Sequence, residues 1–491
     1  MQKFISKYAT AAHLALLAVA PLILSPFFKE EVVADVLLWL SAITFVWVLM
    51  EPSRRLDEML HDARSRVVRS VWTDHVFWIA LAVVIILAIA ALNTGVSLAC
   101  ERNDDRFVWT IQSAFVPILP GSVSGCGYLP FAVSIAALTV ITGCRHALGK
   151  AARASFLFSA SFLAGLSGVV FAVVSYCGNV TITAFFAADW HEPSFMGFGY
   201  LLYFLSSIAV LPLAAENRWL SQLPLFLIII AIGGTSLGLV LFAPPLIMLV
   251  AAIALIPTLL FVLVYRFIHA GMLPAFRLLA VFLLSLTIPF LTVEGLIADG
   301  NKDLVAKFES VGEKHFLCDN YDAGRKLFAL SAEKSWKVHP WLGSGIGSHP
   351  LTFRFNASQV ASSVDKELGY AADQHTAISK IVSPMQKGSF HGWWLFITER
   401  GLIGLLSVAA IVVLLLSTVV LRSVSKGFKS ALNPVVFIAL VALGVEISSG
   451  FHDVSFLRPE AVLAVGAFLA LAGASIPAPK KKTGDDGAPK L

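Results

Sequence analysis

Charged residues are scarce in this sequence. Asp, Glu, Lys and Arg together make up 14% of the 491 residues, whereas soluble domains contain about 25%. The mean hydropathy is +0.81, and apolar runs of about 20 residues recur between short charged segments. An ordinary soluble domain is therefore excluded, and the sequence predicts an all-α polytopic membrane protein.

Three other patterns are missing. Apolar and polar residues do not alternate over segments of about ten residues, as they do in outer-membrane barrels. No nucleotide-binding motif lies within a βαβ pattern, and the histidines lack the close spacing to carboxylates that metal sites show. We therefore expect no metal and no cofactor. The run Lys480-Lys481-Lys482 follows the last apolar segment, where it indicates a membrane anchor rather than a nucleic-acid patch.

The N-terminus is similar to a signal peptide but lacks a cleavage site. Lys3 and Lys7 precede an apolar run that ends at Ser25-Pro26-Phe27-Phe28-Lys29, with no small-x-small pattern. We interpret this run as an uncleaved first span.

Twelve apolar segments are long enough to be transmembrane helices. They lie near 11–27, 32–50, 76–97, 128–147, 155–176, 196–214, 222–240, 243–265, 278–297, 394–421, 432–449 and 460–476. A break near Pro244-Pro245 is expected because the apolar run from 222 to 265 is too long for one span. The chain is thus divided into a first membrane block (1–297), a loop domain (298–390), a second membrane block (391–476) and a basic tail (477–491).

The distribution of Lys and Arg predicts the orientation. With both termini inside, the inside segments hold 20 of these residues and the short outside loops hold 4. Positive residues favour the cytoplasmic side. We therefore expect both termini to be cytoplasmic and the large loop to be periplasmic, in a bacterial inner membrane.

Cysteines are also few, five in the whole chain. Cys100 and Cys126 share one outside loop, and Cys177 and Cys318 also fall outside. In an oxidising compartment Cys100 and Cys126 can form a disulfide, although four outside cysteines allow other pairings.

The loop domain is the long polar interval of the chain and contains or borders five of the twelve histidines. A helix is expected from Ala323 to Lys337, because apolar residues recur there at helical spacing. The helix should break at His339-Pro340-Trp341-Leu342-Gly343. The glycine-dense run Gly343-Ser344-Gly345-Ile346-Gly347 predicts a turn or a backbone nest for an anion.

Arg325 and His391 are the main candidates for chemistry. Arg325 can hold a phosphate through forked hydrogen bonds, or it can form a surface ion pair with Asp322 or Asp319. His391 stands where the loop re-enters the membrane, as a base or as a capping residue. Glu399 is about 12 Å further along a helix, so we expect it to pair with a basic group or to hold the helix start instead. Gly401 and Gly404 predict a face for close helix packing.

These residues carry a family resemblance. The block His391-x-x-x-Leu395-x-x-x-Glu399-x-Gly401-x-x-Gly404 resembles the signature of the O-antigen ligase and polymerase superfamily. So does the run from Arg325-x-Leu327-Phe328 through Trp336 to Pro340-Trp341-Leu342-Gly343-x-Gly345-x-Gly347. The layout, about a dozen spans with one large outside loop, is similar over most of the chain, and the motifs cover about 325–404.

The resemblance implies a metal-independent membrane glycosyltransferase. It would move a glycan from a polyprenyl-diphosphate carrier to an acceptor, either a glycan or a lipid-linked sugar. His391 would be the base and Arg325 would hold the diphosphate. Glu399, Arg400, Trp341 and Gly345 are the predicted substrate-binding residues. A ligase and a surface or exopolysaccharide polymerase are not separated by these motifs.

Two departures from the family pattern stand out. His391 is followed by Gly392 where the family usually has asparagine. The family also has Ser-Arg-Gly near the end of an earlier span, whereas the best alignment here, Gly234-Thr235-Ser236-Leu237-Gly238, has Leu237 in place of the arginine. Four arginines can replace it: Arg400, Arg354, Arg458 and Arg102.

A transporter or flippase for a lipid-linked glycan is the alternative from another functional class. It should have broken helices and polar groups at the bilayer midplane. Glu446 is the main candidate for an ionisable residue within a span.

Overall fold

The computed structural model describes residues 2–50, 67–103, 106–112, 116, 118–178, 193–216, 224–243, 245–298, 320–349, 351–353, 356, 360, 392–426, 433–450 and 458–475. The first half of the chain forms α1 (Gln2–Leu24), α2 (Glu30–Met50), α3 (Val67–Trp72), α4 (His75–Leu92), β1 (Ser97–Asn103), β2 (Arg106–Gln112), α5 (Tyr128–Thr142), the π-helical turn η1 (Gly143–Ala147), α6 (Lys150–Gly178) and α7 (Pro193–Glu216). The second half forms α8 (Leu225–Phe242), α9 (Pro245–Ala270), α10 (Met272–Ala298), α12 (Asn320–Val338), α15 (Gly392–Lys426), α17 (Pro434–Ser449) and α18 (Pro459–Ser475).

The described helices confirm a multi-pass helical membrane protein. Nine of them are long and apolar enough to cross a bilayer, namely those over 30–50, 75–92, 128–147, 152–174, 196–213, 225–242, 247–270, 272–295 and 392–421. Three shorter apolar helices, Tyr8–Leu24, Pro434–Ser449 and Pro459–Ser475, stand where the other three spans were expected. The break at the proline pair is confirmed, because α8 ends at Phe242 and α9 begins at Pro245.

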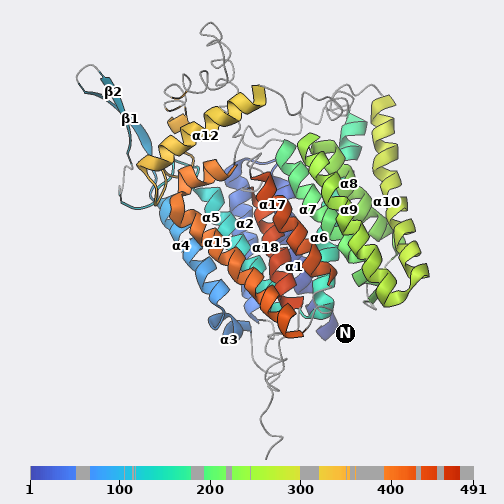
Figure 1. The fold of residues 1–491 in the computed structure, drawn as a ribbon. Helices are drawn as coiled ribbons and strands as arrows, with labels where there is room; N and C mark the ends of the chain where they lie inside the picture. The colour runs from blue at the N-terminus through green and yellow to red at the C-terminus, as the bar shows by residue number, and fades with distance from the viewer. Residues whose placement is uncertain are drawn as a thin grey trace, which may run out of the picture.

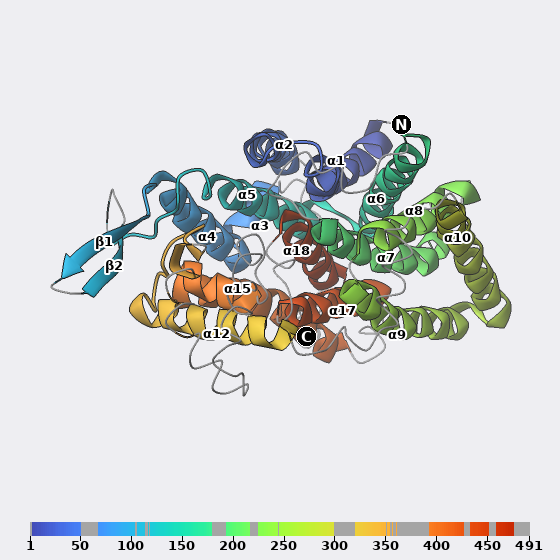
Figure 2. The same ribbon diagram turned by 90° about the horizontal axis from the view of Figure 1, so that it is seen from above.

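The bundle has two distinct ends. Figure 1 shows α12 and the β-hairpin at one end and the N-terminus with α3 at the other. We call these ends the α12 face and the N-terminal face. Seen from above in Figure 2, α18 lies near the middle of the bundle, where it packs against α1, α5, α7, α15 and α17.

A β-hairpin interrupts the otherwise helical fold, which the all-α prediction did not include. β1 and β2 pair in antiparallel register, with Cys100 opposite Trp109. The second strand is rich in β-branched and aromatic residues, which favour strands. Cys126 is a free thiol, so the disulfide between Cys100 and Cys126 is not formed. Burial raises the pKa of the Cys126 thiol to about 11.

Large apolar side chains cover the outside of the bundle. Trp39 on α2 is 73% exposed, Ile256 on α9 is 70% exposed and Phe290 on α10 is 69% exposed. Many exposed large apolar side chains on one protein indicate contact with an apolar surrounding. On helices of this length, that surrounding is the hydrocarbon of a bilayer.

Glycines bring α6 and α8 into close contact. An added Cβ at Gly234 would lie 2.1 Å from the carbonyl oxygen of Gly165, and one at Gly168 would lie 2.2 Å from that of Gly234. Small residues allow such backbone approach in membrane helices. The stretch aligned with the family's Ser-Arg-Gly is therefore a helix crossing, and Leu237 within it is buried.

Candidate functional site

Helix α15 is broken near its beginning, on the α12 face. Gly401 has φ 63° and ψ −169°, a backbone conformation almost restricted to glycine. The break separates a short first segment, 392–400, from a long second segment, 402–426. The prediction that Gly401 and Gly404 form a helix-packing face is therefore wrong for Gly401. The atoms nearest to an added Cβ at Gly404 belong to side chains of its own helix, Arg400 and Phe396.

The loop that follows α12 closes this break. The helix α12 ends at Val338 and the loop begins at His339, as predicted. Four backbone hydrogen bonds join the loop to the two sides of the break: Ser344 N–H to Thr398 O (2.7 Å), Gly345 N–H to Glu399 O (3.1 Å), Leu402 N–H to Pro340 O (2.9 Å) and Ile403 N–H to Trp341 O (3.1 Å). The loop thus supplies partners for backbone groups that a helix break leaves unpaired.

Two glycines make this contact possible. An added Cβ at Gly401 would lie 2.3 Å from the carbonyl oxygen of Trp341, and one at Gly343 would lie 2.4 Å from the carbonyl carbon of Glu399. Gly343 also has a positive φ of 73°. The loop and the broken helix therefore meet backbone to backbone, with no space for a side chain on either side.

Glu399 is held by the glycine-dense turn. Gly345 and Gly347 have φ values of 100° and 77°. The N–H groups of Gly347 and His349 donate to the Glu399 carboxylate, the second across 3.4 Å. Such turns aim successive N–H groups at a negative charge. The turn is thus the backbone nest that the sequence suggested, and its anion is a carboxylate of the protein itself.

The other predicted substrate-binding residues surround this nest. The guanidinium of Arg400 lies 4.9 Å from the centre of the Phe396 ring, and its charge acts on Glu399. The side chain of Trp341 is 62% exposed, while Gly345 contributes only its backbone. The structure brings these residues together on the α12 face, and their role in binding a substrate stays a prediction.

Arg458 is the cation that several carboxylates share on this face. It stands just before α18, and its carbonyl accepts the N–H groups of Ala461 and Val462. Its charge acts on Glu30, Glu399 and Glu460. Among the four arginines that can replace the one missing at Leu237, Arg400 and Arg458 therefore lie beside Glu399. Arg102 lies on β1, and Arg354 is outside the described residues.

His349 packs within an aromatic cluster beneath the nest. Its ring centre lies 4.6 Å from that of Phe328 and 5.6 Å from that of Phe353. Burial lowers the pKa of this imidazole to about 3, and its Nδ1 has no hydrogen-bond partner among the described groups. His339 is less buried, and burial lowers its pKa too. At neutral pH we therefore expect an uncharged His349.

The two predicted catalytic residues are placed only in part. Arg325 lies on α12, within the helix that the sequence predicted, but its side chain is outside the described part of the structure. His391 and His375 lie outside the described residues as well. Arg325 as the phosphate ligand and His391 as the base therefore remain predictions.

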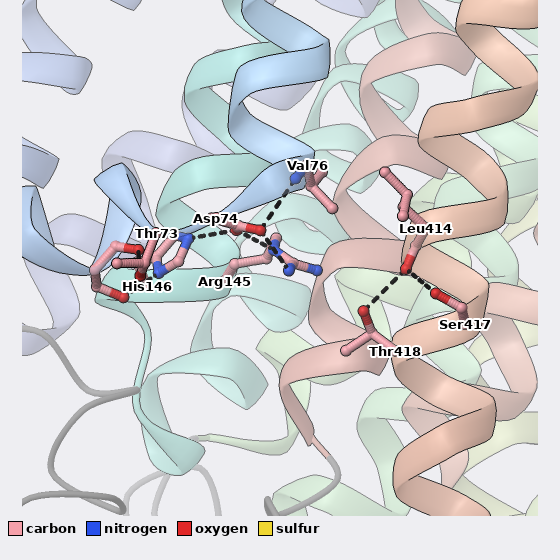
Figure 3. Close-up of polar contacts among 9 residues, drawn as sticks. Thr73, Asp74, Val76, Arg145, His146, Leu414, Ser417 and Thr418 are labelled. Carbon is pink, nitrogen blue, oxygen red and sulfur yellow. Dashed lines mark hydrogen bonds and ion pairs between the residues drawn. The ribbon is translucent and has the colours of Figure 1, made fainter.

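A second polar cluster, which sequence reasoning missed, lies near the N-terminal face (Figure 3). Asp74 accepts hydrogen bonds from Arg145 Nε and Nη2, at 2.8 and 3.0 Å. His146 Nε2 lies 2.7 Å from the same carboxylate, and its Nδ1 lies 2.6 Å from Ser70 Oγ. Asp74 also caps α4 through the N–H of Val76. All four polar side chains are buried.

The ion pairs of this cluster indicate a structural role, and we call the cluster the structural clamp. Burial alone would raise the pKa of Asp74, but hydrogen bonds from His146 and Arg145, with their charges, hold it well below its usual range. The Ser–His–Asp order is also found in hydrolase triads. Here Ser70 is only 2% exposed, so a substrate has no access to its hydroxyl. The cluster ties α3 and the start of α4 to η1.

In the described part of the chain, no three His, Cys, Asp or Glu side chains gather as ligands for a metal ion. Comparison of the sequence with models of known protein families gives no match, and comparison with curated proteins gives none either. The fold defines the class, a multi-pass helical membrane protein, and the activity has to be argued from the α12 face.

Proposed function

We propose that this protein is a metal-independent membrane glycosyltransferase of the O-antigen ligase and polymerase superfamily. It transfers a glycan from a polyprenyl-diphosphate carrier to an acceptor sugar. One observation carries the proposal. Glu399 and Arg400, from the segment that resembles the superfamily, lie near Arg458 at one end of an otherwise apolar bundle.

The proposal includes a topology. All twelve apolar helices cross the inner membrane of a bacterium, both termini are cytoplasmic, and the α12 face is periplasmic. The excess of Lys and Arg in the opposite loops, 20 against 4, supports this orientation. A reporter such as alkaline phosphatase, fused within 298–390, should be active. Activity of a cytoplasmic reporter at the same positions would reverse the topology and remove the site from the periplasm.

The chemistry needs a base and cations. The acceptor hydroxyl oxygen forms a bond to the anomeric carbon of the donor glycan, while the bond from that carbon to the diphosphate oxygen breaks. The electron pair leaves with the diphosphate, and His391 takes the hydroxyl proton. Arg325, with Arg458 beside the α15 break, stabilises the negative charge on the leaving diphosphate.

A transporter for the same lipid-linked glycan is the second candidate, because transporters use broken helices at their binding sites. Two observations weaken it. The break at Gly401 lies only nine residues into α15, and loop backbone already fills it. Glu446 stands in the last turn of α17 rather than near its middle. We therefore favour transfer over transport. A ligase and a polymerase of the superfamily fit the site equally.

The deciding experiment is transfer by the purified protein, with a carrier-linked donor and a sugar acceptor in detergent or nanodiscs. The wild type should release free polyprenyl diphosphate and extend the acceptor without added metal. His391→Ala should keep its melting temperature and lose about 10²–10⁴-fold in rate. Movement of the intact donor across a vesicle membrane without extension of the acceptor would establish transport instead.

A further inference from the structure

Three buried carboxyl groups lie on the α12 face, and they differ in their hydrogen-bond partners and neighbouring charges. Glu399 accepts N–H groups of the glycine turn. Glu460 accepts the hydroxyl of Ser25 at its Oε1 across 3.1 Å, and the charge of Arg458 acts on it, while its Oε2, like that of Glu446, lacks a described hydrogen-bond donor. Glu446 is 9% exposed, its Oε2 has no hydrogen-bond partner, and no described cation acts on it.

A buried carboxyl oxygen without a hydrogen-bond donor, such as Glu446 Oε2, lowers the stability of the fold. Burial of a polar group without a hydrogen bond opposes folding, and ionisable residues kept inside membrane bundles generally serve function. Glu446 lies on the buried side of α17, with Ala442, Leu443 and Val445 as buried neighbours. Because the described protein offers Oε2 no donor, we expect the donor to come from a bound molecule.

The beginning of α15 is docked on the same turn of α17. The indole N–H of Trp393 donates to the carbonyl of Ile447, and the backbone N–H of Trp393 donates to that of Gly450, both at 3.1 Å. Ile447 is the neighbour of Glu446, and the N–H of Gly450 donates to the Glu446 carbonyl. The indole of Trp393 is therefore fixed at the last turn of α17, the turn that also carries Glu446.

We propose that the last turn of α17 and the first turn of α15 form a subsite for the acceptor sugar, in which Glu446 binds a sugar hydroxyl and Trp393 supports the sugar ring. This subsite rests on the proposed function for the identity of its ligand as an acceptor. A carboxyl pairs with a hydroxyl in either protonation state, because a hydroxyl both donates and accepts. An aromatic ring offers an apolar surface to the other side of a sugar.

Direct binding tests the subsite without requiring turnover. The full-length protein in nanodiscs is melted with and without millimolar free hexoses, 6-deoxyhexoses and N-acetylhexosamines, because a ligand of the folded state raises the melting temperature. At least one sugar should stabilise the wild type. Glu446→Leu should remain folded, since an apolar residue suits a buried site, and should bind that sugar about tenfold more weakly.

Glu460→Gln is the control, because Glu460 is also a buried carboxyl of this face but accepts a hydrogen bond from Ser25 and lies near the charge of Arg458. It should melt at a lower temperature and keep its affinity for the sugar. Sugar binding that is unchanged in Glu446→Leu, or absent in a wild type that performs transfer, would overturn the subsite and leave the proposed function intact. Sugar binding that depends on Glu446 in a protein without transferase activity would support the subsite and reject the function.

Discussion

Asp74 and Arg145 are joined by two hydrogen bonds, 2.8 and 3.0 Å long, in a place where both side chains are almost completely buried. Each charge is tolerated there because the other is present. Asp74→Asn would leave Arg145 buried without a negative partner, and we expect it to lower the free energy of unfolding by about 3–5 kcal/mol. Thermal melting of the purified variant measures this. Asp35→Asn is the control, because its hydrogen bond with Tyr128 is exposed; an equal loss there would contradict a special role for the clamp.

Gly401→Ala should destabilise the α12 face. The backbone conformation alone costs a residue other than glycine about 1–3 kcal/mol, and the new methyl group would collide with the carbonyl of Trp341. Gly444 on α17 has open space around it, so Gly444→Ala should be neutral or stabilising by about 0.5–1 kcal/mol. Melting temperatures compare the two. Equal melting of both variants would mean that α15 can straighten at little cost.

Glu399→Ala should make the glycine turn, residues 343–349, less ordered. The N–H groups of Gly347 and His349 would lose their acceptor, at a cost of about 1–3 kcal/mol. Hydrogen exchange at 343–349 should therefore become faster, while exchange in α6 and α8 stays unchanged. If the turn remained protected, its order would come from its backbone hydrogen bonds to the α15 break and to residues 121–123 rather than from Glu399.

His349 predicts a pH dependence of stability. Burial lowers the pKa of its imidazole to about 3, whereas an unfolded histidine titrates near 6.5. Between these values the unfolded chain binds a proton that the folded chain does not, so the free energy of unfolding falls as pH drops from about 6.5 towards 3. His349→Phe should keep the packing against Phe328 and show a flatter melting profile from about pH 7 to 4. An identical slope in both proteins would place the titrating group elsewhere.

Arg325→Lys should damage transfer nearly as much as Arg325→Ala, if Arg325 holds the diphosphate. A lysine ammonium is a point charge and cannot reproduce a forked contact. Arg458→Lys provides the parallel test for the arginine beside Glu399. Transfer rates and donor KM values should be compared for all three variants. Full activity in Arg325→Lys would reduce this residue to a generic surface charge.

The helices were predictable because apolar runs of about 20 residues have few alternatives in a membrane. The break between α8 and α9 followed from the same length argument. The end of α12 also followed from local signals, its apolar spacing and the His339-Pro340 boundary.

Features that depend on distant segments were not predictable. Gly401 interrupts α15 because a loop about 60 residues earlier in the chain supplies hydrogen bonds there, and a Gly-x-x-Gly pattern alone favours helix packing. Arg145 counts as a positive residue of an inside loop, and nothing local connects it or His146 with Asp74. The hairpin was missed because two seven-residue strands between spans are hard to distinguish from an ordinary loop.

Because α15 is broken at Gly401, the membrane-spanning part of this helix can begin after the break. Residues 402–421 alone amount to about 30 Å of helix, which matches the hydrocarbon thickness of a bilayer. The short first segment of α15, residues 392–400, then does not have to lie in lipid at all. It is attached instead to α12, through the contact of Trp394 and Leu395 with the Leu327 and Phe328 cluster. Glu399 and Arg400 can therefore stand at the membrane boundary, on a short helical segment that contacts both α12 and, through Trp393, the end of α17.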